Sequence, residues 1–208
     1  MADSPPSAPD QFREPVAPST AELTIKGSRF VAEVVPASTE SEAEAAILAV
    51  RKRAYDATHH CTAYRVGADG AVYRFNDDGE PSGTAGRPIL RQIDGQALTN
   101  VVVIVTRYYG GTKLGTGGLI RAYGDAAAEA LTRAEVATRV VRVPVQVRFA
   151  YADTSPALHT IGQFDAEVVG TTYDADTTMR LAVRASEAQA FAAQFTDALR
   201  GRGTVTLL

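Results

Sequence analysis

A glycine-rich segment at residues 106–118 combines residue types that bind phosphate groups. It reads Thr-Arg-Tyr-Tyr-Gly-Gly-Thr-Lys-Leu-Gly-Thr-Gly-Gly and precedes a helical pattern. Free backbone N–H groups and the positive dipole end at a helix start bind anions, and tyrosine rings stack on bases. We predict a nucleic-acid or anion site in this segment, with charge from Lys113 as well. Its candidate residues are Arg107, Tyr108, Tyr109, Gly110 and Gly111.

Two better-known phosphate loops are excluded by the spacing of this segment. Gly110 and Gly115 are separated as in a P-loop, but Thr116 stands where the P-loop lysine belongs. A dinucleotide fingerprint that starts at Gly115 lacks its third glycine, because that position is Ile120. The alternative to a binding site is a tight turn in which glycines supply positive φ angles.

An acidic loop at residues 76–88 is a second candidate. It reads Asn-Asp-Asp-Gly-Glu-Pro-Ser-Gly-Thr-Ala-Gly-Arg-Pro. Carboxylates so close together suit Mg²⁺ ligation or general-base catalysis, so Asp78 and Glu80 are catalytic candidates. The spacing of an EF-hand is absent, which excludes a calcium loop of that kind. A solvated acidic turn is the alternative, but a loop this long and glycine-rich is typical of functional loops.

A pair of histidines heads a predicted strand. Successive strand side chains point to opposite faces, so only one of His59 and His60 reaches a given site. His60 is the candidate proton carrier, and a hydrogen-bonded structural histidine is the alternative. The spacing of the pair with Cys61 is poor for zinc, and a thiol inside a strand is usually inert. The sequence therefore predicts no assigned metal ligands and no cofactor.

Charge is distributed unevenly along the chain. The formal net charge of −3 argues against general affinity for nucleic acid. Residues 87–121 nevertheless contain five basic residues and one acidic residue, and Arg87 among them is a further candidate for anion binding. The basic run at residues 51–53 is a weaker one, more typical of a solvated helix end. A local basic site is expected.

Composition indicates a soluble cytoplasmic protein. Hydrophobic residues make up 45% and charged residues 22% of the 208 residues, which suits a packed core. The single cysteine fits a reducing compartment. No apolar run approaches the roughly 18 residues of a membrane span, and the beginning of the chain lacks a secretory signal pattern.

The site segments are expected to lie in a first domain at residues 21–142. Residues 1–20 are rich in proline and are predicted to be a disordered tail. Thr39 and Glu42 have capping-box spacing before a helix, and Val101–Val105 predicts a strand buried on both faces. The other elements predicted here are strands at 23–26, 29–35, 61–66 and 72–75, helices at 88–98 and 119–136, and loops at 76–86 and 110–118.

A second domain is predicted at residues 143–208. Strands are expected at 145–151, 167–173, 178–183 and 204–208, with helices at 156–164 and 186–199. This β-α-β-β-α-β order is the ferredoxin-like arrangement. The fold class is therefore α+β, with two domains.

Four motifs together resemble the bacterial YigZ branch of the Impact family. They are Lys26-Gly-Ser-Arg-Phe30, His59-His-Cys-Thr-Ala-Tyr64, the acidic loop from Asp77 to Pro88, and Arg107 to Gly118. The resemblance implies an N-terminal domain with the α+β fold of a ribosomal protein and elongation factor G, and a C-terminal domain similar to the last domain of that factor. Eukaryotic members act in translational control through a stress-kinase activator, using an additional domain. No enzymatic activity follows from the family, and Lys113 is not part of its shared pattern.

The leading interpretation is a non-enzymatic regulator of translation that binds RNA or the ribosome. Arg107 and the loop amides would engage phosphates while Tyr108 or Tyr109 stacks on a base. The alternative is an enzyme acting on a small phosphorylated or acyl substrate, with Asp78 and Glu80 as metal ligands or base and His60 as proton carrier. A third interpretation is an adaptor whose C-terminal domain docks a protein partner. No membrane partner is expected.

Overall fold

Five consecutive β-branched residues begin β6 (Val101–Tyr108) in the computed structural model, which describes residues 10–208. Val101, Val103 and Val105 pack into one core, and Val102 and Ile104 pack into another. The strand is therefore buried on both faces, as predicted.

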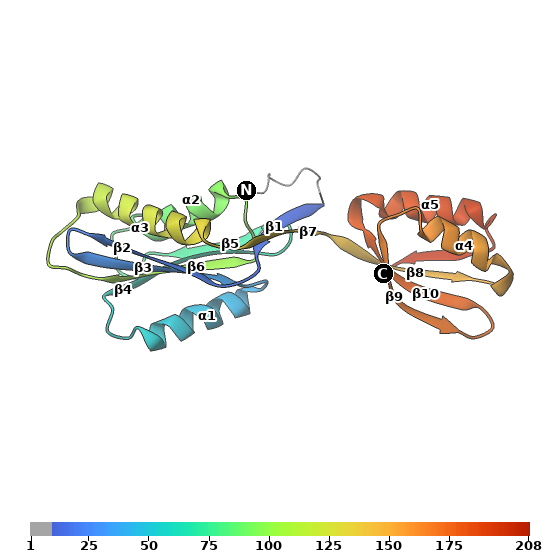
Figure 1. Cartoon of the computed structure of the whole chain (residues 1–208), viewed down its shortest axis with the longest axis horizontal. Helices are drawn as coiled ribbons and strands as arrows, with labels where there is room; N and C mark the ends of the chain where they lie inside the picture. Colours follow the sequence, from blue (N-terminus) through green and yellow to red (C-terminus); the bar gives the residue numbers. More distant parts are fainter. Residues whose placement is uncertain (1–9) are drawn as a thin grey trace. The chain divides into compact units, whose positions relative to one another are not determined.

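β6 is the middle strand of a five-stranded antiparallel sheet with the order β2-β3-β6-β4-β5. Helices α2 and α3 cover one face of this sheet, and α1 covers the other (Figure 1). The remaining strands are β2 (Ser19–Ile25), β3 (Ser28–Pro36), β4 (His59–Val66) and β5 (Val72–Asn76). The helices are α1 (Glu40–Arg53), α2 (Gly86–Gly95) and α3 (Gly115–Thr132).

The predicted capping interaction of Thr39 with Glu42 is present at the start of α1, but the return hydrogen bond goes to Ser38 instead of the N-cap residue Thr39. The Glu42 N–H donates to the Thr39 hydroxyl over 3.2 Å, and the Glu42 carboxylate accepts from the Ser38 N–H over 2.7 Å. The helix ends with a run of basic residues, whose positive charges interact favourably with the negative end of the helix dipole.

Two strands occur where other structure was predicted. β1 (Gln11–Pro15) and the start of β2 replace the second half of the predicted tail, whose first nine residues lie outside the described residues. Proline is compatible with the end of a strand at a sheet edge, so Pro15 does not prevent pairing. β1 pairs with β7 (Val136–Val140), which lies beyond the true end of α3. The predicted extension of that helix to residue 136 was therefore wrong.

α3 also begins earlier than predicted. Residues 115–118 form its first turn instead of the end of a loop. Glycine disfavours a helix by about 1 kcal/mol relative to alanine, which is why the sequence pattern indicated a loop. Here the packing of the following apolar residues against the sheet stabilises the whole helix.

The second unit comprises residues 140–208 together with 10 and 11. Its sheet order, β11-β8-β10-β9, is antiparallel throughout and ferredoxin-like, as predicted. Helices α4 and α5 cover one face. The strands are β8 (Arg142–Phe149), β9 (Ala166–Tyr173), β10 (Thr177–Arg184) and β11 (Thr204–Leu207), and the helices are α4 (Thr154–Ile161), α5 (Ala188–Ala198) and the 3-10 turns η1 (Tyr151–Asp153) and η2 (Ala185–Glu187). Across residues 10–208, no helix has both the length and the apolar character of a membrane span.

Asp10 is held to this second unit by a bidentate ion pair. Its two oxygens accept from Nε and Nη2 of Arg184, each over 2.9 Å, and Oδ2 also accepts from the Ser186 N–H over 3.1 Å. These hydrogen bonds hold the pKa of Asp10 well below its usual range, with those from Arg184 contributing most.

Replacing Asp10 should therefore give a pH-dependent loss of stability. A carboxylate with a depressed pKa stabilises the fold above its ordinary pKa of about 4, and this contribution is lost as the pH falls through the folded-state value. We expect Asp10→Asn to lower the melting temperature at pH 7, with a difference from wild type that shrinks progressively below about pH 4. Circular dichroism melts from pH 7 to pH 2 measure this.

The exposed Asp197, for which no ion pair occurs among the described residues, provides the control. Asp197→Asn should change the melting temperature little at any pH. A difference between Asp10→Asn and wild type that stays constant with pH would contradict the assignment.

Candidate functional site

The sheet brings the three predicted segments to one end of the first unit. His59 of β4 pairs in register with Arg107 of β6. The acidic loop leaves the end of β5, which is the other neighbour of β4. Residues far apart in sequence thus meet where these strands end.

Arg107 lies at the centre of a buried polar network. It is only 5% exposed, and its Nη1 donates to Oε1 of Glu80 over 2.6 Å. The Tyr123 hydroxyl of α3 donates to the same oxygen over 2.7 Å, and Nη2 of Arg107 donates to the Ser28 hydroxyl over 3.3 Å. The guanidinium also lies 5.4 Å from the ring centre of Phe30. Arg107 is therefore a fixed, paired cation below the surface, and the predicted direct contact of its guanidinium with a phosphate does not fit this burial.

One polar atom of this network has no partner. Nε of Arg107 is buried and has no hydrogen-bond acceptor among residues 10–208. Burying such a donor costs free energy unless something satisfies it. The network thus retains a donor that the described protein atoms do not use.

Asp77 shapes the acidic loop, a role that the sequence did not indicate. Its Oδ1 accepts from the N–H groups of Ala85 and Gly86 over 3.0 and 2.8 Å, and Oδ2 accepts from the Gly83 N–H over 2.8 Å. The carboxylate therefore caps the start of α2 and folds the intervening loop back on itself. Because it acts six to nine residues along the chain, local capping patterns do not reveal it.

The two histidines point to opposite faces of the sheet, as predicted. The ring of His60 forms a hydrogen bond with the Ala54 carbonyl over 3.1 Å on the α1 side. The backbone N–H of His60 donates to the Asp78 carboxylate. Asp78 also pairs with Arg51 of α1 over 2.5 Å. His59, on the other face, bonds to the Asp78 carbonyl over 2.7 Å and lies 3.9 Å from Glu80.

The catalytic cluster expected from His60, Asp78 and Glu80 is therefore divided by the sheet. Glu80 belongs with Arg107, whereas Asp78 and His60 belong with α1. No three His, Cys, Asp or Glu side chains in the described part of the chain are placed to hold a metal ion together. The geometry brings His59, rather than His60, toward Glu80.

Cys61 is a core residue. It is fully buried, and its thiol donates to the Asp77 carbonyl over 3.1 Å. Burial raises the pKa of this thiol to about 12, and burial likewise raises the pKa of the neighbouring Tyr123 hydroxyl far above its usual range. Both groups stay protonated at neutral pH, so neither provides a ready nucleophile or base.

A pocket of about 270 Å³ opens above the Arg107–Glu80 pair. Tyr109 stands beside it, 46% exposed, with its ring centre 5.4 Å from the Arg107 guanidinium. The lining residues are Glu80, Pro81, Arg107, Tyr109, Lys113, Leu114, Gly115, Thr116 and Leu119. The pocket thus joins the acidic loop to the glycine-rich segment and the start of α3.

The glycines of this segment differ in whether the structure requires them. Gly110 is needed inside the protein, because a Cβ there would lie 2.0 Å from the Gly27 backbone. Gly111 and Gly115 have positive φ angles of 84° and 71°, which glycine adopts without strain. Gly117 has neither constraint, since its φ is ordinary and a Cβ would meet no atom within 4 Å. Nothing in the described structure requires glycine at this helical position.

The amino-terminal end of α3 is left open to an anion. No side chain within residues 10–208 caps it, and its first turn has no acidic residue. Its first N–H groups therefore keep their hydrogen-bonding capacity beside Lys113.

Other predicted binding residues lie outside the pocket lining. Arg87 packs over Phe75 at 5.7 Å, and Tyr108 packs against the Arg29 guanidinium at 4.2 Å. Gly110 and Gly111 contribute to the shape of the loop beside the pocket.

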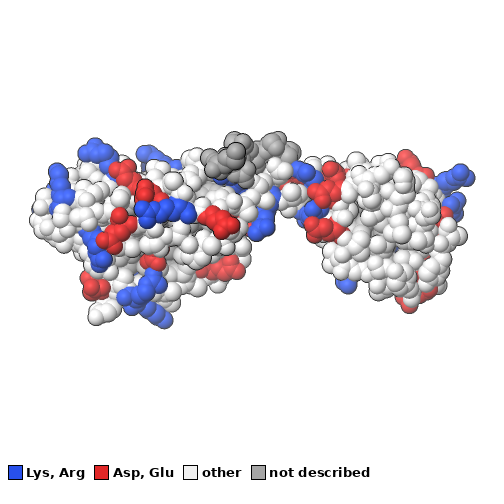
Figure 2. All heavy atoms as spheres, viewed as in Figure 1, with Lys and Arg blue, Asp and Glu red and all other residues white. Residues whose placement is uncertain are grey.

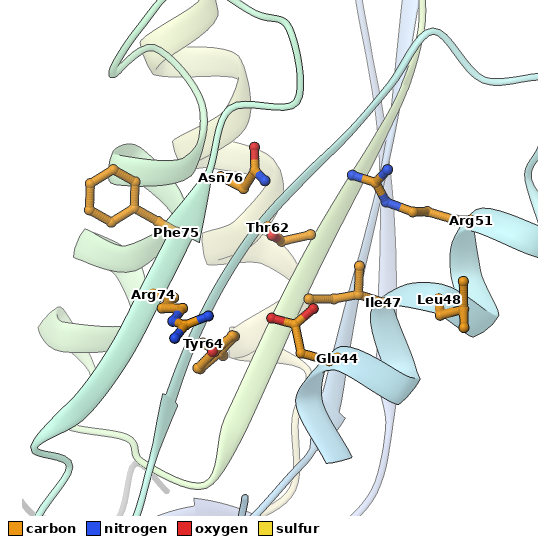
Figure 3. Close-up of a pocket in the computed structure, with 9 residues that line it drawn as sticks. All are labelled: Glu44, Ile47, Leu48, Arg51, Thr62, Tyr64, Arg74, Phe75 and Asn76. Carbon is orange, nitrogen blue, oxygen red and sulfur yellow. The ribbon is translucent and has the colours of Figure 1, made fainter. Parts of the chain in front are cut away.

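A second pocket of about 370 Å³ lies on the α1 face (Figure 3). Figure 3 shows the α1 side chains on one side of the pocket and those of β4 and β5 on the other. Thr62 lies between the two sides, and Phe75 points away from the pocket. The lining residues are Glu44, Ile47, Leu48, Arg51, Thr62, Tyr64, Arg74, Phe75 and Asn76. Although larger, it contains none of the principal predicted site residues, so the pocket at α3 is the candidate functional site.

Two family models match the chain. The one described as Impact N-terminal domain matches residues 26–131, and the one described as a domain of unknown function, DUF1949, matches residues 147–202. Their boundaries fall within the two units of the structure.

Known proteins are similar over most or part of the chain. "IMPACT family member YigZ" of Escherichia coli (strain K12) is 35% identical over 90% of this chain and 93% of its own length. "Protein IMPACT homolog" of Saccharomyces cerevisiae is 32% identical over 45% of this chain and 37% of its own length. A solved structure described as that of a hypothetical protein is 33% identical, with a TM-score of 0.69 over 96% of this chain and 98% of that one.

The buried pair should show strong energetic coupling. Removing one partner of a buried ion pair leaves an uncompensated charge and typically costs about 3–5 kcal/mol. We expect Arg107→Met to lower the free energy of unfolding by that amount in urea titrations. Adding Glu80→Gln removes the second charge but keeps an acceptor for Tyr123, and should recover about 1–3 kcal/mol.

Arg91→Met on α2 is the control, because Arg91 is exposed and should change stability by no more than about 0.5 kcal/mol. Strictly additive effects of the two substitutions at the buried pair would show that the charges do not act together.

Proposed function

The chain belongs to the Impact family, and from this membership and the pocket at α3 we propose that it regulates translation by binding RNA, free or in the ribosome. The observation that carries the proposal is the uncapped, glycine-rich start of α3, which opens on a pocket beside Lys113 and Tyr109. Phosphate would be bound by the N–H groups of this helix end and by Lys113. The exposed ring of Tyr109 would stack on a base.

Charge distribution favours a local contact over a broad electrostatic surface. On the face shown in Figure 2, acidic and basic side chains are interspersed over the first unit. The protein also carries a net charge of −3. A short single-stranded segment that engages a few phosphates suits such a surface better than a duplex, which presents about one charge per 1.7 Å.

The sequence resemblance to the Impact family implies domains similar to parts of elongation factor G, and this expectation favours RNA as the ligand. Similarity of fold is an associational argument, so the proposal depends mainly on the pocket. In it, Arg107 has an indirect role, because its pairing with Glu80 fixes the floor beneath the binding surface.

Lys113→Ala should weaken RNA binding and reduce its dependence on salt. For single strands, each phosphate neutralised contributes about 0.7 to the slope of log affinity against log salt. We expect filter binding of a short single-stranded RNA to give a shallow slope, reduced by about 0.7 in the variant. Absence of binding by wild type at low salt, or a Lys113→Ala variant with unchanged slope, would refute the proposed contact.

Arg133→Ala is the matched control for that charge. Arg133 follows the last residue of α3, about 27 Å from its start at 1.5 Å per residue. Its removal should leave RNA affinity and salt slope unchanged.

Gly117→Ala should separate stability from binding. An added methyl group meets no internal atom, and alanine is favoured over glycine in a helix by about 0.5–1 kcal/mol. We expect the variant to be slightly more stable in urea but to bind RNA several-fold more weakly, because the methyl group obstructs approach to the helix end.

Gly95→Ala provides the comparison, since Gly95 is also helical and has equally open surroundings at the end of α2. It should gain similar stability and keep full RNA affinity. Equal RNA affinity of the two variants would contradict close approach of RNA at Gly117.

A further inference from the structure

The floor of the pocket at α3 is a buried carboxylate, an unusual partner for a polyanion. We propose that this pocket accepts a guanine base of single-stranded RNA, recognised by Glu80. The inference rests on the proposed function and specifies its ligand. A fixed carboxylate beside a proposed phosphate site requires a ligand that also donates hydrogen bonds.

The size and walls of the pocket suit one base. Binding pockets for whole small molecules usually measure about 300–1,000 Å³, so a volume of about 270 Å³ suits a single ring system. Pro81, Leu114 and Leu119 provide apolar walls, and Tyr109 provides an aromatic one. Single-stranded RNA is commonly recognised through bases that are splayed out, stacked on aromatic rings and read at their Watson–Crick edges.

Glu80 presents an acceptor that the protein leaves partly unused. Arg107 and Tyr123 both donate to Oε1, and no hydrogen bond to Oε2 occurs among residues 10–208. These two donors also fix the orientation of the carboxylate. A rigid, largely desolvated acceptor discriminates strongly, because an unmatched ligand leaves it without a partner.

Guanine matches a carboxylate better than the other bases. Its N1–H and N2–H groups are adjacent donors on the Watson–Crick edge. Adenine, cytosine and uracil each place a lone pair next to their donor, and a carboxylate repels that lone pair. Because Oε1 of Glu80 already accepts from Arg107 and Tyr123, the N1–H and N2–H groups of a guanine would both donate to the unused Oε2.

The same placement leads the RNA backbone to the phosphate site. Lys113, Gly115 and Thr116 form part of the same lining as Glu80. A base that enters the pocket therefore brings its own phosphate near the start of α3. Base and phosphate recognition become parts of a single nucleotide site.

The test is a panel of short RNAs on the wild-type protein. Each oligonucleotide has one central variable base in a uridine background, namely guanine, adenine, cytosine, uracil or inosine. We expect guanine to bind about tenfold or more tightly than adenine, cytosine or uracil, in line with a good bidentate base contact. Inosine lacks the N2 amino group and should lose most of this advantage.

The outcomes separate this inference from the proposed function. Equal affinity for all five oligonucleotides would overturn guanine recognition and leave RNA binding standing. No binding to any of them would overturn both. Competition by free GMP that equals the guanine oligonucleotide in affinity would keep the base preference but replace RNA with a mononucleotide as its source.

A variant provides an independent check. Glu80→Gln should reduce the preference for guanine over adenine to within a few-fold, whereas Glu22→Gln, an exposed carboxylate on β2, should keep it. If Glu80→Gln does not fold, the inosine comparison on wild-type protein still decides the question. Full preference for guanine in a folded Glu80→Gln variant would refute the role of this carboxylate.

Discussion

The buried pairing of Arg107 with Glu80 is the interaction on which the rest of the first unit's functional end depends. It joins β6 to the acidic loop, and Tyr123 and Ser28 extend it to α3 and β3. Two charges removed from water are expensive, and their attraction offsets that cost only where the geometry is good and further hydrogen bonds are made. Replacing a buried ion pair by well-packed hydrophobic residues is often neutral or stabilising in proteins. The proposed ligand site gives a reason for a charged pair at this place, because the pocket would present the carboxylate of Glu80 to that ligand.

The same network fixes the glycine-rich segment. The Ser28 hydroxyl accepts from Arg107 and from the Gly110 N–H, over 3.3 and 3.2 Å. Gly110 lies against the backbone of Gly27, where no side chain fits. The segment thus has a rigid beginning, tied to the floor of the pocket, and an open end at the first turn of α3. Such an arrangement fixes the helix end in advance, so the proposed ligand would bind there with little loss of conformational entropy.

The sequence predicted those features that depend on residues close together along the chain, and missed those that depend on distant partners. The buried β6, the capping interaction of Thr39 with Glu42 and the β-α-β-β-α-β order all depend on local periodicity, and each was predicted correctly. Opposite orientations of His59 and His60 also follow from local geometry. The pairing of β1 with β7, the capping of α2 by Asp77 and the burial of Arg107 depend on partners distant in sequence. Because its partner Glu80 is distant in sequence, Arg107 resembled a surface cation.

The start of α3 lacks features that would stabilise it, and the proposed anion site gives a reason for their absence. A capping side chain or an acid in the first turn would each stabilise the helix, and neither is present. Either would also occupy the N–H groups or repel an anion there. Glycine at position 117 weakens the same turn without any internal steric need. Departures from local consistency of this kind concentrate at functional sites, and three of them coincide within one turn of helix beside a pocket whose floor is already charged and fixed.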